Sequence, residues 1–156
     1  MSKRISLVSS TGGHWSQLLE VYKEIIGNEE IEDKNVKVIT EKNDVNNTTN
    51  YYYLIQQDRK NRWFLLILLM NFFKSVVYVI KFRPHYVIST GAGVVLPFLI
   101  SAKIFGAKII FIESFAKVNS PTLTGRIVYR FADYFFVQWE EMLVHYPKAI
   151  FKGSLY

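Results

Sequence analysis

Two glycine-rich turns, each between a short apolar run and a helical pattern, constrain the fold of this chain more than any other feature. Residues 5–8 read Ile-Ser-Leu-Val and lead into Ser-Ser-Thr-Gly-Gly-His at residues 9–14. Residues 87–93 repeat this order as Val-Ile-Ser-Thr-Gly-Ala-Gly. A strand, a glycine turn and a helix start predict a parallel sheet whose carboxyl edge gathers both helix N-termini. Backbone N–H groups and helix dipoles favour an anion there, most often a phosphate.

The same two turns leave a second interpretation open, in which glycine serves only the geometry of two tight connections. The first turn is not the dinucleotide fingerprint Gly-x-Gly-x-x-Gly, and no Gly-Lys-Ser/Thr follows it as in a P-loop. His14 stands at the mouth of the predicted site, where an imidazole can take or give a proton near neutral pH.

Strand and helix patterns alternate along the chain, which predicts an α/β fold with a parallel sheet and right-handed crossovers. We expect one domain over residues 1–156, because this length is short for two. The predicted strands are 4–9, 35–40, 51–55, 86–89, 108–112, 134–137 and 149–151; the predicted helices are 14–26, 62–82, 93–105, 122–132 and 139–145; a charged turn is expected at 28–34 and a polar loop at 41–50.

The composition argues against several kinds of site. The chain has no cysteine, and its three histidines, His14, His85 and His145, are far apart, so neither a disulfide framework nor a metal site is expected. The N-terminus has two basic residues and a short apolar run followed by glycines, which is a strand pattern rather than a signal peptide. We therefore expect the protein on the cytoplasmic side of the membrane.

Charge is distributed unevenly along the chain. Residues 1–58 hold 6 Lys and Arg against 9 Asp and Glu, a net charge of −3, and residues 59–156 hold 13 against 4, a net charge of +9. The positive part is also the more apolar part. This combination favours an anionic membrane surface over nucleic acid, whose binders carry their charge on more polar surfaces.

The predicted helix at 62–82 is unusually apolar and, at about 30 Å, long enough to cross a bilayer. Its polar residues form one narrow stripe that a spanning helix does not need, and a lysine near mid-bilayer costs roughly 3 kcal/mol. Two alternatives remain: the helix is buried between the sheet and its neighbours, or one flank packs on the sheet while the other enters the membrane interface. The stripe is Asn71, Lys74, Ser75, Tyr78 and Lys81; the membrane-binding residues of the second alternative are Arg62, Trp63, Leu66, Leu69 and Phe73.

A carboxylate follows the predicted strand at 108–112. Glu113 should therefore lie at the same carboxyl edge as the glycine turns. There it is expected to orient a substrate hydroxyl, to act as a general base or to cap a helix, and a purely structural role is an equal alternative.

Several short motifs together resemble one family over nearly the whole chain. They are Ser-Thr-Gly-Gly-His at 10–14, Ser-Thr-Gly-Ala-Gly at 89–93, Ile-Glu-Ser-Phe-Ala-Lys-Val at 112–118, Thr-Leu-Thr-Gly-Arg at 122–126 and Val-Gln-Trp at 137–139. The chain resembles the Alg-fourteen-like family, the membrane-anchoring, acceptor-side subunits of two-chain glycosyltransferases, whose bacterial relatives act in capsule and exopolysaccharide assembly. More distantly, it is similar to the N-terminal half of the peptidoglycan GlcNAc transferase that makes lipid II.

The resemblance implies a Rossmann-like domain equivalent to the N-terminal, acceptor half of a GT-B glycosyltransferase. The sugar-nucleotide half would come from a second polypeptide, a catalytic UDP-sugar-binding subunit. Together they would transfer a sugar from a UDP-sugar to a polyprenyl-diphosphate-linked acceptor without a cofactor or bound metal. The eukaryotic subunit begins with a membrane-spanning helix that this sequence does not show, so we expect peripheral association with the cytoplasmic face of a bacterial plasma membrane.

The resemblance also implies roles for individual residues. His14 or Glu113 would deprotonate the acceptor hydroxyl. A non-catalytic membrane scaffold for the partner chain and a free-standing nucleotide-binding domain stay open as alternatives. The acceptor diphosphate would be held by Thr11, Gly12, Gly13, Thr90, Gly91, Gly93 and Ser114, and the partner would dock on Gln138, Trp139, Tyr146, Phe151, Leu155 and Tyr156.

Overall fold

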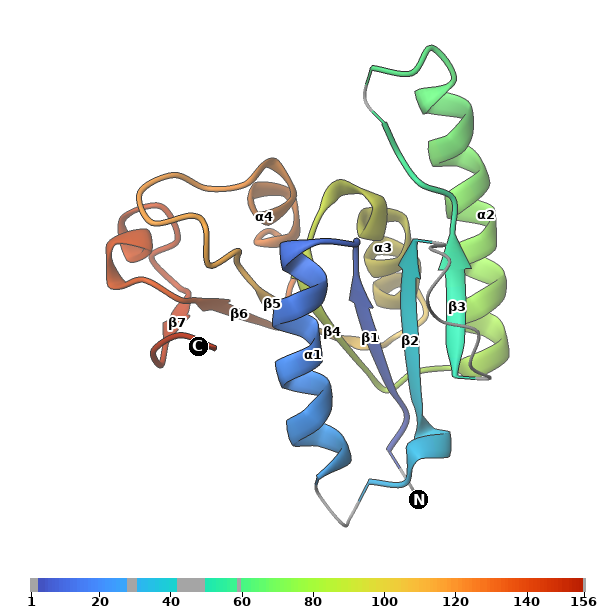
Figure 1. The fold of residues 1–156 in the computed structure, drawn as a ribbon, viewed down its shortest axis with the longest axis horizontal. Helices are drawn as coiled ribbons and strands as arrows, with labels where there is room; N and C mark the ends of the chain where they lie inside the picture. The colour runs from blue at the N-terminus through green and yellow to red at the C-terminus, as the bar shows by residue number, and fades with distance from the viewer. Residues whose placement is uncertain (1–2, 28–30, 42–49, 59, 156) are drawn as a thin grey trace.

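The computed structural model describes residues 3–27, 31–41, 50–58 and 60–155, and its centre is one parallel sheet (Figure 1). Seven strands follow the order β3-β2-β1-β4-β5-β6-β7. They are β1 Ile5–Ser9, β2 Val36–Glu41, β3 Tyr51–Leu54, β4 Tyr86–Gly91, β5 Lys108–Ile112, β6 Tyr134–Val137 and β7 Ile150–Phe151. Each predicted strand is present, with bounds shifted by at most two residues. The strands that lead into the two glycine turns, β1 and β4, are neighbours.

The helices follow the predicted alternation, with two differences. The helix predicted at 122–132 is α-helical only over Leu123–Val128 (α4), and the one predicted at 139–145 is a 3-10 helix over Glu140–Val144 (η3). Beyond α4 the backbone continues as turns, in which the N–H groups of Arg130 and Phe131 donate to carbonyls three residues back. The α-helices are α1 Gly13–Ile26, α2 Phe64–Phe82, α3 Leu96–Ile104 and α4 Leu123–Val128; the 3-10 helices are η1 Asp33–Asn35, η2 Gly93–Val95 and η3 Glu140–Val144. Most of the expected polar loop (42–49) and part of the charged turn (28–30) lie outside the described residues.

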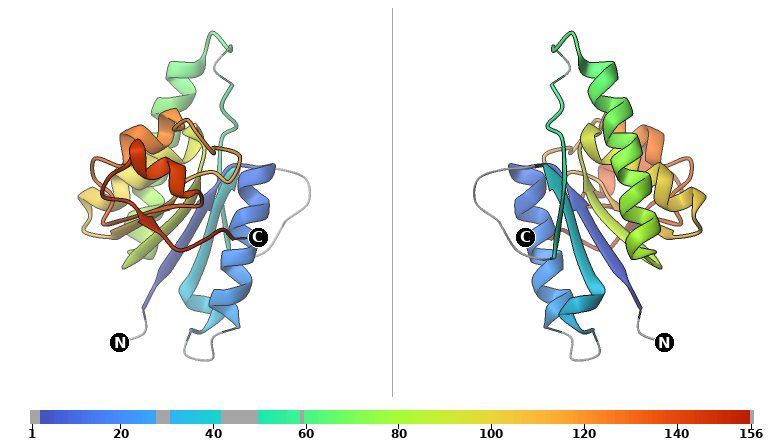
Figure 2. Two further views of the ribbon diagram at one scale, coloured as in Figure 1. Left: turned by 90° about the vertical axis from the view of Figure 1, so that its left-hand side faces the viewer. Right: turned by 90° about the vertical axis from the view of Figure 1, so that its right-hand side faces the viewer.

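Helices cover both faces of the sheet. α1 packs on one face, against apolar residues of β1 and β2 that include Leu7 and Val38. α2, α3 and α4 cover the other face, where Val8, Ile109 and Phe98 belong to the larger apolar cluster. Figure 2 shows α1 and α2 on opposite sides of the sheet. The alternation of apolar residues along the strands thus builds a three-layer α/β arrangement.

α2 differs from an ordinary surface helix because it buries polar residues and exposes apolar ones. By length and composition alone it is apolar enough to cross a membrane, with a mean hydropathy of 1.9. The residues that it buries are Asn71, Ser75 and Val79. The Asn71 side chain donates to the carbonyl of Ile55 and accepts its N–H, both at 2.8 Å, so the amide serves the backbone beyond edge strand β3.

The outer face of α2 is correspondingly apolar and exposed. The large apolar side chains of the helix and its N-cap that are at least 46% exposed are Trp63, Leu65, Leu66, Leu69, Met70, Phe73, Val77 and Ile80. The alternative in which the helix is enclosed between the sheet and its neighbours is therefore wrong. The polar stripe turns in part toward β3 because the edge strand offers backbone groups that need partners.

Candidate functional site

The two glycine turns lie side by side at the carboxyl edge of the sheet, as their strand order predicts. Val8 pairs with Ser89, but the next residue, Ser9, pairs with Gly91, so Thr90 is an extra residue on β4. Such a bulge bends the strand and re-aims its backbone. The bulge residue is the point at which the second turn contacts the first.

His14 and Thr90 join the two turns through a pair of hydrogen bonds. The His14 ring nitrogen Nδ1 lies 2.7 Å from the carbonyl oxygen of Thr90, and the Thr90 hydroxyl donates to the carbonyl of His14 at 2.8 Å. Because a carbonyl oxygen only accepts, Nδ1 carries the hydrogen in this contact. In the neutral imidazole, the other nitrogen, Nε2, then carries no hydrogen and has the lone pair that can accept one.

The backbone of the second turn is compatible with few side chains. Gly91 has φ 111°, and a Cβ added there would lie 3.2 Å from atoms of the His14 ring. Ala92 has φ 79° and ψ 154°, a region that is almost reserved for glycine. In the first turn, Gly12 has φ 80° and open space around it. Backbone strain and close ring packing thus concentrate where the turns meet, as they do at functional sites.

A cavity of about 330 Å³ opens beside the turns, between the start of α2 and the segments η2 and α4. One wall is apolar and the other carries polar groups and the backbone of the second turn. His14 is not among the lining residues. The lining residues are Ser10, Glu41, Gln56, Gln57, Phe64, Leu68, Ala92, Gly93, Val94, Leu96, Leu123, Thr124 and Ile127.

Glu41 is the carboxylate of this cavity, and it is not among the site residues predicted from the sequence. It is 6% exposed. One oxygen accepts from the N–H and the hydroxyl of Thr11 at 3.3 and 3.2 Å, and the other accepts from the N–H of Gln57 at 3.2 Å. Glu41 therefore connects the first glycine turn to the segment that leads into α2. The signal that was available is a carboxylate directly after an apolar strand, the same signal that singled out Glu113.

Glu113 lies in a different environment. It is 1% exposed, and its two oxygens accept hydrogen bonds from Ser114, Thr122 and Tyr146. The Tyr146 hydroxyl donates at 2.7 Å, and burial together with this carboxylate raises the pKa of Tyr146 far above its ordinary range. Ser114 is itself buried and uses its N–H in this cluster. The structure thus places Glu113 and Ser114 in a packed hydrogen-bond cluster.

The motif of residues 122–126 contains a glycine, Gly125, because no side chain fits at this position. A Cβ added there would lie 2.1 Å from a Glu113 carboxylate oxygen and 2.6 Å from the Tyr146 hydroxyl. The first turn of α4 therefore lies directly against the carboxylate. The Thr122 hydroxyl accepts the N–H of Gly125 at 2.8 Å and caps this helix.

The residues expected at a partner interface separate into two groups. Gln138 and Tyr146 are only 4% and 2% exposed, so their side chains do not lie on an open surface as expected. The Gln138 amide donates to Gln17 at 2.7 Å and to the Glu113 carbonyl at 2.8 Å, which ties α1 to the loop after β5. The indole of Trp139 donates to the Phe115 carbonyl at 2.7 Å.

The C-terminal segment lies at the surface beside this cluster. Phe151 is 38% exposed, and Leu155 is half-buried with its N–H bonded to Gln138 at 3.0 Å. Together with β5 and β6, residues 152–155 line a cavity of about 250 Å³. Tyr156 lies outside the described residues.

The expected membrane-binding residues all lie on the exposed side of α2 or at its start. The Arg62 guanidinium lies over the Trp63 ring, 5.0 Å from its centroid. Leu66 is 49% exposed and Phe73 is 61% exposed. The same helix contributes Phe64 and Leu68 to the cavity beside the glycine turns, so the apolar face and the candidate site adjoin.

Comparison with known proteins identifies a family that covers nearly the whole chain, and relatives that match about half of it. The family described as "Oligosaccharide biosynthesis protein Alg14 like" matches residues 5–155. The mouse UDP-N-acetylglucosamine transferase subunit ALG14 is 31% identical over 87 residues, which cover 52% of this chain and 40% of the relative. The subunit of the same name from Candida albicans is 34% identical over 91 residues, covering 54% and 42%. The chain thus spans about two fifths of the length of these curated relatives.

Solved structures show the same fold at low sequence identity. MurG from Acinetobacter baumannii superposes with a TM-score of 0.69 at 17% identity, over 89% of this chain and 42% of MurG. The UDP-N-acetylglucosamine 2-epimerase from Rickettsia bellii gives a TM-score of 0.71 at 11% identity, over 99% and 46%. The chain therefore has the Rossmann-like fold that makes up just under half of each of these larger proteins.

Proposed function

The chain belongs to the Alg14-like family of oligosaccharide biosynthesis proteins, and from this premise we propose that it is the acceptor-side subunit of a two-chain glycosyltransferase. The observation that carries the proposal is the carboxyl edge of the sheet, where two joined glycine turns adjoin a cavity and an exposed apolar helix. The curated relatives are named as subunits of a UDP-N-acetylglucosamine transferase, which supports a site that is completed by a second polypeptide. The partner would bind the UDP-sugar, and this chain alone would transfer little or no sugar.

We propose that the acceptor is a polyprenyl-diphosphate-linked sugar bound at this edge. The exposed backbone of Gly12 and Gly13, and that of Gly93 in the cavity wall, offers N–H groups to the diphosphate. The hydroxyls of Thr11 and Thr90 are already bonded within the protein, so these residues position the turns. Ser114, buried in the Glu113 cluster, and Gly91, packed under the His14 ring, are left out of this cradle.

The cavity beside the cradle suits the other two parts of such an acceptor. Glu41 would repel a diphosphate but accepts hydrogen bonds from sugar hydroxyls. Phe64 and Leu68 form an apolar wall that leads onto the outer face of α2, where the polyprenyl chain would enter the membrane.

We assign the general base to His14 rather than to Glu113. The hydrogen bond to Thr90 orients the imidazole and leaves the lone pair of Nε2 free to accept the proton of the attacking acceptor hydroxyl. The oxygens of Glu113 accept four donors out of contact with solvent, so Glu113 is a positioning residue that holds α4 and the loop after β5.

We propose further that the catalytic partner docks beside β5 and β6, where Phe151, Leu155 and a small cavity are available. The outer face of α2 supports peripheral association with the cytoplasmic face of a bacterial plasma membrane, in capsule or exopolysaccharide assembly. The motif resemblance to bacterial relatives carries this last step.

Co-expression with the product of the neighbouring gene tests the proposal. The purified pair is assayed with radiolabelled UDP-sugars and a polyprenyl-diphosphate-linked acceptor. We expect transfer by the pair and almost none by either chain alone. Full activity of the partner alone would contradict the proposal, and UDP-sugar binding by this chain alone would favour a free-standing nucleotide-binding domain.

A further inference from the structure

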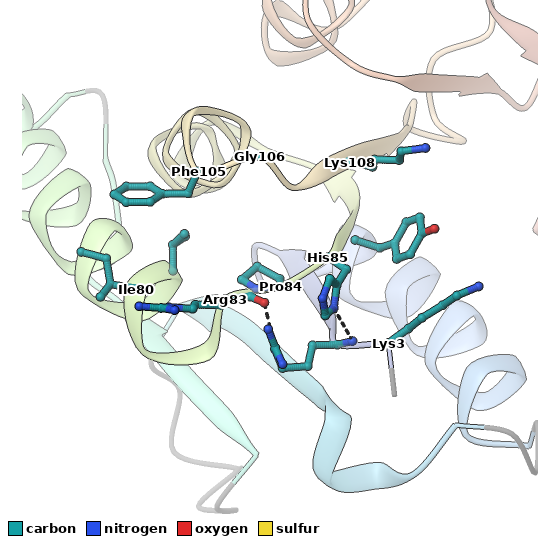
Figure 3. Close-up of a pocket in the computed structure, with 11 residues that line it drawn as sticks. Lys3, Ile80, Arg83, Pro84, His85, Phe105, Gly106 and Lys108 are labelled. Atoms are coloured by element: carbon teal, nitrogen blue, oxygen red, sulfur yellow. Dashed lines mark hydrogen bonds between the residues drawn. The ribbon is translucent and has the colours of Figure 1, made fainter. Parts of the chain in front are cut away.

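A second, basic cavity lies at the opposite edge of the sheet, and the proposed transfer leaves it without a role. It encloses about 830 Å³ between the segment before β1, the starts of β4 and β5, and the ends of α2 and α3 (Figure 3). Its charged side chains are all cationic. Within the described ranges none of them forms a salt bridge: Lys3, Arg4, Arg83 and Lys108.

Hydrogen bonds hold the floor of this cavity in place. The Arg4 side chain donates from Nε to the carbonyl of Arg83 at 2.9 Å, and the Arg4 backbone N–H donates to Nδ1 of His85 at 3.0 Å. His85 therefore keeps its ring N–H at Nε2, which makes it a further donor. Arg83 has φ 49°, so the chain turns sharply after α2 and presents this side chain at the end of the helix.

One end of the cavity is apolar. Figure 3 shows Ile80 and Phe105 at one end and Lys3 and Lys108 at the other. Ile80 is 47% exposed and Phe105 is 56% exposed, so this wall continues into the exposed outer face of α2. The cavity thus joins a cationic surface to an apolar one, which is the pattern that an anionic amphiphile requires.

We propose that this cavity binds the phosphate-bearing head group of an anionic phospholipid, as a second membrane contact distinct from the acceptor site. The inference rests on the proposed association of α2 with the membrane. α2 is about 28 Å long, with Arg62 at one end and the basic cavity at the other. Head groups at both ends of the helix hold it flat on the surface, so the acceptor cavity at its first turn faces the same bilayer.

An apolar wall is what distinguishes a lipid from a soluble phosphate as the occupant. A soluble anion gains nothing from Ile80 and Phe105, whereas the glycerol and first methylenes of a phospholipid contact both. Arg4 and His85 support the fold through backbone contacts, so the variants that test the cavity leave them unchanged.

The test uses the full chain and sedimentation with two kinds of vesicle, pure phosphatidylcholine and a mixture with phosphatidylglycerol. The triple variant Lys3→Gln/Arg83→Gln/Lys108→Gln is compared with Arg130→Gln/Lys148→Gln/Lys152→Gln, which removes the same charges from exposed sites elsewhere. Each basic residue near an anionic surface contributes roughly fivefold to binding, so the cavity variant should bind the anionic vesicles about a hundredfold more weakly. The control should stay within severalfold of wild type, and binding to neutral vesicles should be equal for all three.

Equal losses in both triple variants would overturn the inference, because binding would then follow net charge alone. Calorimetry with inorganic phosphate and with glycerol 3-phosphate provides the second measurement. Saturable binding of either, lost in the cavity variant, would assign the cavity to a soluble anion instead. Thermal unfolding verifies that both variants fold. Transfer by the co-expressed pair to a detergent-solubilised acceptor should be unchanged in the cavity variant, so failure here and failure of the proposed function are separable.

Discussion

His14 and Thr90 hold each other by two hydrogen bonds across 76 residues of chain, one through the imidazole and one through the threonine hydroxyl. The pair makes one structure of two turns that belong to different βα units. It also directs Nδ1 of the His14 ring to the Thr90 carbonyl.

Replacement of His14 by Gln removes the proposed base while leaving a polar side chain at the mouth of the site. We expect sugar transfer by the co-expressed pair to fall by about 10²–10⁴-fold, the usual contribution of general base catalysis. Partner binding, measured by co-purification, should be unchanged. The Thr90→Ser variant keeps the hydroxyl and serves as the control. Full transfer by the His14 variant would favour the non-catalytic scaffold.

Gly91→Ala tests the packing of the His14 ring on the second turn. The new methyl group meets that ring at 3.2 Å, and the backbone has φ 111°. Gly153→Ala is the matched control, because it carries a similar strain at φ 91° with open space around it. Positive-φ strain alone costs about 1–3 kcal/mol, so we expect Gly91→Ala to lower the free energy of unfolding by more than the control and to impair transfer. Equal losses in urea denaturation would show that the ring contact contributes nothing.

Gly125→Ala should destabilise the protein although alanine is the better helix former. The added methyl group would overlap the Glu113 carboxylate, so α4 has to move away from β5. We expect a loss of about 2 kcal/mol or more in the free energy of unfolding. Gly13→Ala, in the first turn of α1 with open space, should instead have a small effect on stability. A neutral Gly125→Ala variant would contradict the close contact.

Tyr146 should make stability sensitive to alkaline pH. Burial first, and then the hydrogen bond and charge of Glu113, raise the pKa of this phenol above its ordinary value of 10.0. Because the pKa is higher in the folded state, the contribution to stability is complete below pH 10 and is lost as the pH rises further. The free energy of unfolding of wild type, measured by urea denaturation, should therefore fall steeply above pH 10. The Tyr146→Phe variant should be less stable at neutral pH, and its free energy of unfolding should fall less steeply as the pH rises. Parallel pH profiles would contradict the prediction.

The outer face of α2 should decide membrane binding to neutral lipid. The variant Leu66→Glu/Leu69→Glu places two charges on this face without touching its buried side. We expect vesicle flotation to be lost, because each inserted charge is costly in an apolar environment. The control Val118→Glu/Val144→Glu alters two other exposed apolar residues and should float like wild type. Equal flotation of both folded variants would contradict the proposal that the outer face of α2 binds the membrane.

Much of the architecture could be predicted from local patterns. The strands, α1, α2 and α3 and the meeting of both glycine turns at one edge follow from periodicity, glycine placement and parallel topology, all of which are legible over short windows. α4 and η3 are shorter and less regular than predicted, and the segments around them are held by long-range hydrogen bonds to Asp133 and Glu113. Those contacts join residues from 9 to 33 positions apart.

By itself, the sequence determined the fold class, the family and the presence of one unusually apolar helix, because each depends on residue order and composition. Tertiary structure decided which face of α2 is exposed, since the backbone of Ile55, directly after edge strand β3, binds the Asn71 side chain. It also decided that Glu113 is enclosed while Glu41 faces a cavity, although both follow apolar strands. The environment of a carboxylate depends on hydrogen-bond donors from distant segments, and a local sequence pattern does not show which segments will lie beside it.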